Sequence, residues 1–515
     1  MKSIFFRKKI IFSADNCTLF NTFASVNNKT LDSMTTTEWF LDTINQLNDY
    51  LWTYVVIVML IGCAVYFTIR AKGVQFWLLK DMLKVIVNRP IYINKVEKDS
   101  KENLSVEDER LKKIGSFQAF AVSLSSRVGT GNLAGVASAI FVGGPGAVFW
   151  MWVMALFGAA TAFVEATLAQ LYKRRGKDSF YGGPAYYMQF GLHRKWMGVL
   201  FAVLITITFG IANQVVQSNT LCDAIADTMG IGREWVGATL TAATLVIIFG
   251  GVTRISRFSC IIVPIMAIGY ILLSAFVLLM NITAIPAMIA LIIKSAFGIE
   301  QAAGGMLGVA VMQGIKRGLF SNEAGEGSAP NAAAIASTSH PIKQGLLQAL
   351  GVFADTLVIC SCTAFVILLS GIYDSGRDGI ILTKYALVNH VGSLGGLFIT
   401  AAIFCFAYST IIANYFYGET NIRFITQSKK PIFVFRIITG VTVMAGALVT
   451  LQTAWSLVDF AMGLMTLVNL AAIIQLSPKV FRLLDNYLEQ RRNLQDPQFK
   501  RSMMPDIEKD VECWE

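Results

Sequence analysis

Long apolar segments alternate with short polar segments along most of the chain, and this pattern predicts a protein that crosses a membrane many times. Eleven apolar segments of roughly 20 to 30 residues can be distinguished, and about 20 residues span the hydrocarbon core of a bilayer as a helix. They lie near 51–70, 117–142, 146–172, 196–228, 235–250, 257–280, 306–338, 345–370, 395–418, 432–450 and 454–476. We therefore expect an all-α polytopic membrane protein with about 11 transmembrane helices. An outer-membrane barrel is excluded, because its strands would be about ten residues long and of alternating polarity.

The regions outside these segments are polar and less informative. We expect residues 1–50 to form an N-terminal tail. An alternative interpretation of residues 1–33 is an extension upstream of the true start codon, which would then encode Met34. Residues 71–116 form a long loop, and its part 74–87 is short and amphipathic, which is typical of a helix on the membrane surface. Segment 285–300 is apolar but fits either a helix on the outer surface or a re-entrant segment.

Composition supports a membrane protein and gives little basis for an enzyme. Apolar residues make up 55% of the chain and charged residues 15%, against about 25% charged residues in ordinary soluble domains. Five of the eight cysteines lie in apolar segments, where cysteine packs as a small apolar side chain. The histidines His193, His340 and His390 lie in predicted loops, and the sequence has no zinc-protease, nucleophile-elbow or phosphate-loop motif. We therefore predict no catalytic residues and no cofactor.

Positively charged residues are concentrated in alternate loops, and this pattern predicts the topology. Loops 71–116, 173–195, 250–257, 339–344 and 418–431 contain 22 Lys and Arg residues, whereas the loops between them contain 4. Because cytoplasmic loops carry the Lys and Arg excess, the first set faces the cytoplasm. The N-terminal tail then lies outside and the C-terminal tail, 477–515, lies in the cytoplasm. The formal net charge of +10 therefore reflects membrane orientation, and we expect a lipid bilayer rather than nucleic acid as partner.

Two of the eleven segments are poor helices. Residues 123–135 and 314–330 place glycine, asparagine and charged residues at mid-membrane depth. They belong to the second and seventh segments, so each opens a set of five. Interrupted helices at matching positions in two halves of a chain are typical of a transporter binding site. The freed amides suit a carboxylate, and the freed carbonyls suit an ammonium group or a metal cation.

Several of these residues also have simpler explanations. Residues 129–134 match the dinucleotide-binding pattern GxGxxA, but that pattern requires a preceding strand, and glycines four residues apart also occur in packed membrane helices. Packing does not explain the charged residues within the spans, which are Arg127, Glu323, Glu326 and Asp355. Ionisable residues at this depth are costly and usually paired or functional, so we expect Arg127 to pair with Glu323 or Asp355.

Two pairs of uncharged polar residues allow two interpretations each. Gln214 and Gln217 are three residues apart and share one face of the fourth segment, where they either bind a ligand or bond neighbouring helices. Ser409 and Thr410 are adjacent in the ninth segment, where they either bind a ligand or bond back to their own helix.

The sequence at these positions resembles the alanine or glycine:cation symporter family. The matching motifs are residues 116–119, 127–136, 143–152, 317–325 and 327–330, within a resemblance that covers roughly residues 50–480. The resemblance implies a leucine-transporter-like fold of two inverted five-helix repeats, 117–280 and 306–476, preceded by one extra helix, 51–70. It also implies sodium-driven uptake of a small neutral amino acid, alanine or glycine, across a prokaryotic plasma membrane. Glu326 departs from the apolar residue expected in many relatives.

The resemblance also assigns roles to individual residues. It implies that the first interrupted helix binds the substrate carboxylate and the second binds the ammonium group, with Phe320 as an apolar lid. The candidate substrate-binding residues are Gly129, Thr130, Gly131, Asn132, Gln214, Gln217, Phe320, Ser321 and Asn322. The candidate sodium ligands are the carbonyl groups near Ser125 and Val128 and the hydroxyl groups of Ser409 and Thr410. A fixed cation at Arg127 disfavours a second sodium ion, so we expect one per substrate.

Two other functions are compatible with a polytopic membrane protein. A passive or amino-acid-gated pore would need a continuous polar path and would equilibrate its substrate without concentrating it. An intramembrane enzyme would need a nucleophile and a base within the spans, where no histidine lies. The preferred amino acid, its stereoisomer, the ion stoichiometry and the oligomeric state stay open, and a monomer is compatible with the sequence.

Overall fold

The computed structural model describes residues 36–87, 114–176, 179–250, 252–298, 304–493 and 496–514. The hypothesis about residues 1–33 and most of the loop 71–116 lie outside these ranges. The chain divides into two compact units, residues 1–47 and 48–515. In the first unit the described residues belong to helix α3 (Thr36–Tyr50), and all later elements belong to the second.

The second unit is helical apart from one short hairpin among the described residues. Strands β1 (Arg174–Arg175) and β2 (Phe180–Tyr181) pair antiparallel, with Arg174 opposite Tyr181. The first helices are η2 (Leu51–Val56), α4 (Ile57–Arg70), α5 (Val74–Trp77) and α6 (Leu79–Val87). Next come α9 (Ser116–Arg127), η3 (Gly131–Gly135), α10 (Val136–Gly143), α11 (Gly146–Leu171), α12 (Pro184–Gly191), α13 (Lys195–Ile207), η4 (Thr208–Ala212), α14 (Asn213–Met229), α15 (Arg233–Ile248) and α16 (Val252–Met280).

The C-terminal half of the chain has the same character. Its helices are η5 (Ile282–Ala284), α17 (Ile285–Ala296), α18 (Gly304–Asn322), α19 (Ala329–Ala334), α20 (Pro341–Val352), η6 (Phe353–Cys360), α21 (Ser361–Leu369), α22 (Gly379–Val391), α23 (Ser393–Ile425), α24 (Lys429–Gly446) and α25 (Leu451–Asn493). The short helices η7 (Arg501–Met503) and η8 (Pro505–Asp510) follow.

Six helices in the described part of the chain are long and apolar enough to cross a membrane. They are Trp39–Arg70, Gly146–Leu171, Lys195–Met229, Pro341–Leu369, Ser393–Ile425 and Leu451–Asn493. A seventh is present if Pro264–Met280 and Ile282–Ala296, which are bent by 79° at their junction, form one span. The prediction of an all-α polytopic membrane protein is therefore confirmed, with six to seven clear apolar spans.

Two helices are interrupted, at the segments where the sequence places glycine and asparagine within apolar runs. The first interruption, residues 128–130, separates α9 from the π-helical turn η3. The second separates α18 from α19, and there Gly325 and Gly327 have φ angles of 98° and 85°. This left-handed region costs glycine little. Glu323 also has a positive φ, of 56°, which is unusual for a side chain of its size.

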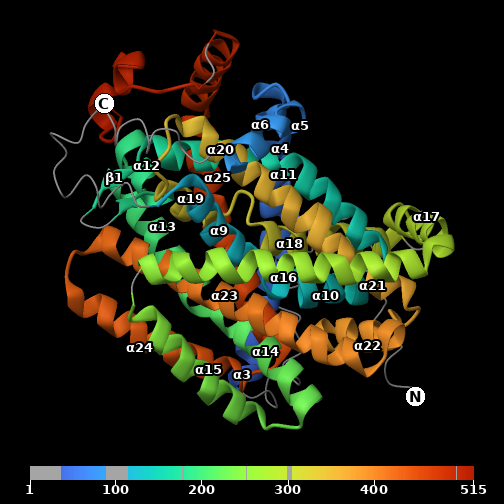
Figure 1. The fold of residues 1–515 in the computed structure, drawn as a ribbon. Coiled ribbons are helices and arrows are strands. Elements are labelled where there is room, and N and C mark those ends of the chain that lie inside the picture. The colour runs from blue at the N-terminus through green and yellow to red at the C-terminus, as the bar shows by residue number, and fades with distance from the viewer. Residues whose placement is uncertain are drawn as a thin grey trace, which may run out of the picture. The chain divides into compact units, whose positions relative to one another are not determined.

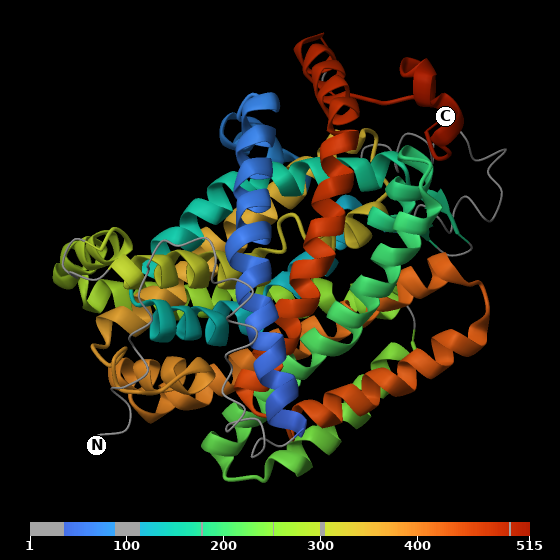
Figure 2. The ribbon, with the colours of Figure 1, turned by 180° about the vertical axis from the view of Figure 1, so that it is seen from behind.

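The interrupted helices lie between two groups of continuous helices. Helix α11 packs against α18, α19 and α20, while α23 packs against α9, α14 and α16 (Figure 1). Helices α9 and α19 also contact each other, as do α10 and α18. On the other side of the molecule, α4 runs beside α25 (Figure 2). The breaks in the two helices are therefore buried at the centre of this bundle.

Two of the ambiguous segments are helical. The predicted surface segment 74–87 forms α5 and α6, which are separated at Leu78. Segment 285–300 contains α17, whose C-terminal end packs against the first turn of α11. There Gly146 N donates to Ser295 Oγ at 3.0 Å, and Trp150 Nε1 donates to the Ala296 carbonyl at 3.2 Å.

Candidate functional site

At the break in the first interrupted helix, side-chain oxygens bind two backbone amides, of which that of Gly129 also donates to the Arg127 carbonyl at 2.9 Å. Gly129 N donates to Asn132 Oδ1 at 2.9 Å, and Thr130 N donates to Gln217 Oε1 at 3.1 Å. Thr130, Asn132 and Gln217 are buried. A buried amide without a partner is costly, so these side-chain acceptors stabilise the non-helical backbone. The same two amides are the groups that a ligand carboxylate would approach.

Glycine is required at this break for steric reasons. A β-carbon on Gly131 would lie 3.0 Å from Cδ1 of Phe320 and 3.2 Å from Cα of Ser321. A β-carbon on Gly129 would collide with the hydroxyl of Thr410. Neither glycine has a positive φ, so the conformation of the backbone does not require glycine here. The two interrupted helices and α23 therefore approach one another closely where the first helix breaks.

Asp355 of η6 connects the two interrupted helices. Its Oδ1 accepts from Asn132 Nδ2 at 2.6 Å, and its Oδ2 accepts from Ser321 Oγ at 2.7 Å and from its neighbour Thr356 at 2.9 Å. Asp355 is fully buried and forms no ion pair within 4.0 Å among the residues that the structure describes. Cys360 lies beside this cluster, with its sulfur 3.1 Å from Ser321 Oγ. The arrangement places one carboxylate charge at the meeting point of both breaks.

The expected direct ion pair of Arg127 is not formed within the described part of the chain. Arg127 is buried, and its Nη1 donates to the Gln348 carbonyl at 3.1 Å. Glu323 instead accepts from the hydroxyls of Ser126 and Ser328, each at 2.5 Å. Two serine hydroxyls therefore bind the Glu323 carboxylate in place of Arg127. The Arg127 guanidinium still attracts this carboxylate, but over a longer distance than an ion pair.

A second glutamate cluster was missed by the sequence analysis. Glu165, in α11, accepts from the Gly325 amide at 3.2 Å and from Asn469 Nδ2 at 2.8 Å. The same Asn469 amide donates to the Gly325 carbonyl at 2.9 Å. Glu326 is also buried, and its Oε1 has no hydrogen-bond partner in the described residues. The signal for Glu165 was available, because it is a lone charge within a long apolar segment.

Most of the candidate sodium ligands lie together. Thr410 Oγ1 lies 2.9 Å from the Ser125 carbonyl, 3.4 Å from the Val128 carbonyl and 3.0 Å from the Phe406 carbonyl of its own helix. Ser409 Oγ donates back to the same Phe406 carbonyl at 3.0 Å. The structure therefore brings Thr410 to the break, whereas the hydrogen bond of Ser409 is local.

The remaining candidates surround this centre. Gln214 Nε2 donates to the Ile411 carbonyl at 3.0 Å, so this residue contacts α23 rather than the first break. Asn322 Nδ2 donates to Thr356 Oγ1 at 3.2 Å. Phe320 packs edge-on against Trp455, with ring centroids 4.7 Å apart. Phe320 and Trp455 therefore form an aromatic cover beside Gly131.

An ion pair that the sequence did not indicate lies next to this cover. Arg317 Nη2 is 2.6 Å from Asp459 Oδ2, and both side chains are buried. The Arg317 guanidinium also lies over the Trp455 ring, 3.9 Å from its centroid. Helices α18 and α25 are thus joined above the break by one charged and one aromatic contact.

A helical membrane protein in which two interrupted helices meet at a buried polar site belongs to the class of secondary transporters. Comparison with known proteins identifies the family within that class. The profile of the sodium:alanine symporter family matches residues 37–501, and the chain therefore belongs to this family. It is a transporter and not an enzyme, and the family relationship makes it a cation-coupled amino-acid symporter of the membrane.

Relatives agree with this assignment, and a solved structure shares the fold. The chain is 48% identical to the probable sodium/glutamine symporter GlnT of Bacillus subtilis (strain 168), over 91% of this chain and 94% of that protein. It is 46% identical to the amino-acid carrier protein AlsT of the same organism, over 93% and 98%. Its fold is similar to that of a Na+-coupled sialic acid symporter solved in a substrate-bound outward-open state. That match has a TM-score of 0.52 and 16% identity, and it covers 78% of this chain and 86% of the other.

Proposed function

We propose that the protein is a sodium-coupled symporter that carries a small neutral amino acid into the cell by alternating access. One observation carries the proposal: the Thr410 hydroxyl converges with the Ser125 and Val128 carbonyls at the first break. Hard oxygen ligands of this kind suit a hard cation such as sodium. The membership of a sodium:alanine symporter family supports the same coupling ion.

The proposed substrate site lies between the two breaks. The amides of Gly129 and Thr130 would receive the substrate carboxylate in place of the side-chain oxygens that they bind in this structure. The Asp355 carboxylate would balance the substrate's ammonium group, because it is buried and lacks an ion-pair partner within 4.0 Å in the described residues. A zwitterionic amino acid would then join the first break to α18 and η6.

The walls of this site favour a small side chain. The position of a β-carbon on Gly131 is 3.0 Å from the Phe320 ring, and Trp455 packs edge-on against that ring. We therefore propose alanine or glycine as the preferred substrate. Glutamine is the competing candidate, because a relative that is 48% identical is named as a probable sodium/glutamine symporter. Apolar contacts discriminate by only about 1–3 kcal/mol per methylene, so we expect graded selectivity.

The finer architecture is also part of the proposal. It consists of eleven spans, with an extra helix before two inverted five-helix repeats, 117–280 and 306–476. The Lys and Arg excess in alternate loops supports an outside N-terminus and a cytoplasmic C-terminus in a prokaryotic plasma membrane. Arg127 sits near the first break and disfavours a second sodium, so we propose one sodium per substrate. We propose a monomer as the transporting unit.

Coupling follows from thermodynamic linkage. Sodium would join the first break to α23, and the amino acid would join the first break to the second. Each ligand thus favours the same closed arrangement, and each must raise the affinity for the other by the same factor. Downhill sodium entry then drives uphill amino-acid entry.

The test is uptake by purified protein in liposomes under an imposed sodium gradient. We expect labelled alanine to accumulate above its outside concentration and to leak out when a sodium ionophore collapses the gradient. Glutamine in the same assay identifies the preferred substrate. Equilibration without accumulation would indicate a passive pore, and accumulation driven by a proton gradient alone would refute sodium coupling. Gly129→Leu protein provides the matched negative control, because its side chain would occupy the first break.

A further inference from the structure

Residues 496–514 fold back onto the helical bundle. Five apolar residues of the segment 496–514 are buried: Phe499, Met504, Ile507, Val511 and Trp514. The sequence alone indicated a charged cytoplasmic tail here, since 477–515 contains many Lys, Arg, Asp and Glu residues. Burial of five apolar side chains stabilises the docked segment, at about 1.5–3 kcal/mol for each large side chain that leaves water completely.

Trp514 occupies a position at the C-terminal end of α11. Its Nε1 donates to the Gln170 carbonyl at 3.1 Å, and the Lys173 ammonium lies over its ring, 4.7 Å from the centroid. Lys173 Nζ also donates to the Ala336 carbonyl at 2.9 Å. Gln170 Nε2 donates to the carbonyls of Ala333 and Ala336. Trp514 therefore contacts the Lys173 side chain and the Gln170 backbone, and both of these residues bind the chain at the C-terminal end of α19.

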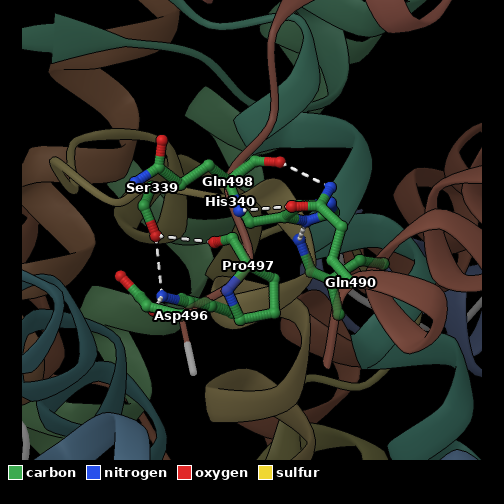
Figure 3. A network of polar contacts seen from close by, with 8 residues as sticks. Ser339, His340, Gln490, Asp496, Pro497 and Gln498 are labelled. Atoms are coloured by element: carbon green, nitrogen blue, oxygen red, sulfur yellow. Dashed lines mark hydrogen bonds and ion pairs between the residues drawn. The ribbon is translucent and has the colours of Figure 1, made fainter. Parts of the chain in front are cut away.

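The connection between α19 and α20 is held from the other side by the start of the same segment. Figure 3 shows Ser339 Oγ bonded to the Pro497 carbonyl, at 3.0 Å, and Gln490 paired with Gln498. Phe499 N donates to the Ser339 carbonyl at 2.9 Å. The Phe499 ring packs edge-on against both His340 and Trp514, at 5.7 and 5.6 Å. The segment therefore contacts the chain immediately after α19 at several atoms.

Ion pairs at the rim complete the docking. Arg174 Nη1 lies 3.1 Å from Glu512 Oε2, and Lys343 pairs with Asp496. The side chain of Glu512 is 41% exposed and that of Asp496 is 53% exposed. Exposed pairs of this kind contribute only about 0–1 kcal/mol each.

The docked segment restrains an element that a transporter must move. Helix α19 follows the second break, and opening such a site toward one side requires the half-helix on that side to change its position. Lys and Arg residues assign this end of α19 to the cytoplasm. We propose that residues 496–514 form an autoinhibitory latch that holds α19 in its closed position and slows opening toward the cytoplasm. The inference rests on the proposed transport function.

A charge-swap series on the full-length protein tests the latch. Arg174→Glu or Glu512→Arg breaks the rim pair, and the double variant restores it with reversed charges. The matched control is Lys72→Glu, which breaks the exposed pair of Lys72 with Asp485 on α25 and leaves the pair of Arg482 with Asp506 between α25 and the segment in place. The two readouts are the initial rate of sodium-driven alanine uptake in liposomes and the labelling rate of an Ala336→Cys variant by an impermeant maleimide. Ala336 is fully buried beneath Gln170 and Lys173, so labelling there reports opening without requiring transport.

We expect each single swap to raise both rates by roughly five-fold, at the low end of typical coupling between sites. The double variant should recover most of the change, because reversed charges restore the pair but a glutamate at position 174 cannot donate to the Asp510 carbonyl as Arg174 does. Lys72→Glu should not change either rate. Faster labelling with unchanged or slower uptake would overturn the latch and leave the segment a purely structural role. Unchanged labelling in both single swaps would also overturn it. If the wild-type protein shows no sodium-driven uptake, the proposed function fails, while the labelling series still decides whether the segment restrains α19.

Discussion

Replacing Thr410 with valine tests the proposed sodium site most directly. The substitution keeps the shape and β-branching of the side chain and removes one oxygen atom. That oxygen lies within 3.4 Å of the Ser125, Val128 and Phe406 carbonyls. If sodium binds among them, the variant loses one ligand and leaves a wholly buried cluster of acceptors without its hydroxyl. The expected result is weaker sodium binding in a protein that still folds.

The size of the effect follows from the burial of the site. Thr410 is buried, and removal of one partner from a buried polar contact costs about 1–3 kcal/mol. Since about 1.4 kcal/mol corresponds to a tenfold change in an equilibrium constant, half-saturation should require roughly 5 to 150 times more sodium. Thr410→Ser keeps the hydroxyl and should stay close to wild type. Ser409→Ala should have a smaller effect than Thr410→Val, because the Ser409 hydroxyl bonds back to Phe406 of its own helix.

The assay is amino-acid uptake by reconstituted protein across a range of sodium concentrations, together with thermal stability measured without ligands. Stability must be measured in parallel, because the Thr410 hydroxyl also bonds α23 to the first break in this structure. An unchanged sodium requirement in well-folded Thr410→Val protein would refute the site. A stability loss as large in Thr410→Ser as in Thr410→Val would show that the packing of this turn, and not its oxygen, is critical.

Three further predictions concern the two breaks and the docked C-terminal segment. In Gly131→Ala protein the new β-carbon would meet Phe320 and Ser321, which should cost about 1–3 kcal/mol. Uptake per folded molecule should fall strongly, while the melting temperature should fall only slightly. Lower stability with normal uptake per folded molecule would assign the glycine to packing. Asp355→Asn should weaken alanine binding at least tenfold, or about 1.4 kcal/mol, in equilibrium binding assays, and unchanged affinity would exclude a role in balancing the ammonium group. Burial lowers the pKa of His340 from 6.5 to about 3, so the unfolded chain takes up a proton that the folded chain excludes as the pH falls below 6.5. The free energy of unfolding should therefore fall by about 2 kcal/mol between pH 7 and pH 5, and His340→Gln protein should lack this part of the decrease in a denaturant titration; an equal decrease in both proteins would contradict the assignment.

The sequence predicts the helices and the breaks better than the contacts between them. The breaks can be predicted because glycine, asparagine and charged residues are rare at mid-membrane depth, and residues 128–129 and 323–328 are indeed non-helical. The contact of Asn132 with Asp355 joins positions 223 residues apart, and no local pattern encodes it. The prediction that Arg127 pairs directly with Glu323 or Asp355 was wrong for a related reason. The cost of a buried charge indicates that Arg127 needs a partner, but it does not show that Ser126 and Ser328 bind the Glu323 carboxylate instead.

The docked C-terminal segment shows the same limit more strongly. Residues 496–514 are rich in charge, which is typical of a solvated tail, although Met504, Ile507, Val511 and Trp514 recur at spacings of three and four residues. Their burial depends on the surface that α11 and the α19–α20 connection present, and that surface exists only after the helices have packed. The spacing of its apolar residues therefore indicates that the segment has a face to bury, but the surface on which it docks is determined by the tertiary fold.

The contact of Glu165 and Asn469 with Gly325 has a mechanical consequence for the second interrupted helix. Two continuous helices, α11 and α25, hold both the amide and the carbonyl of one glycine within the break. A segment fastened at one such point can rotate about it but cannot slide along its axis. Gly325 would then serve as a pivot, with α18 on one side of it and α19 on the other. In the proposed alternating-access cycle, a tilt that moved one of these helices outward on its side of the membrane would move the other inward, which would prevent both ends of the site from opening together.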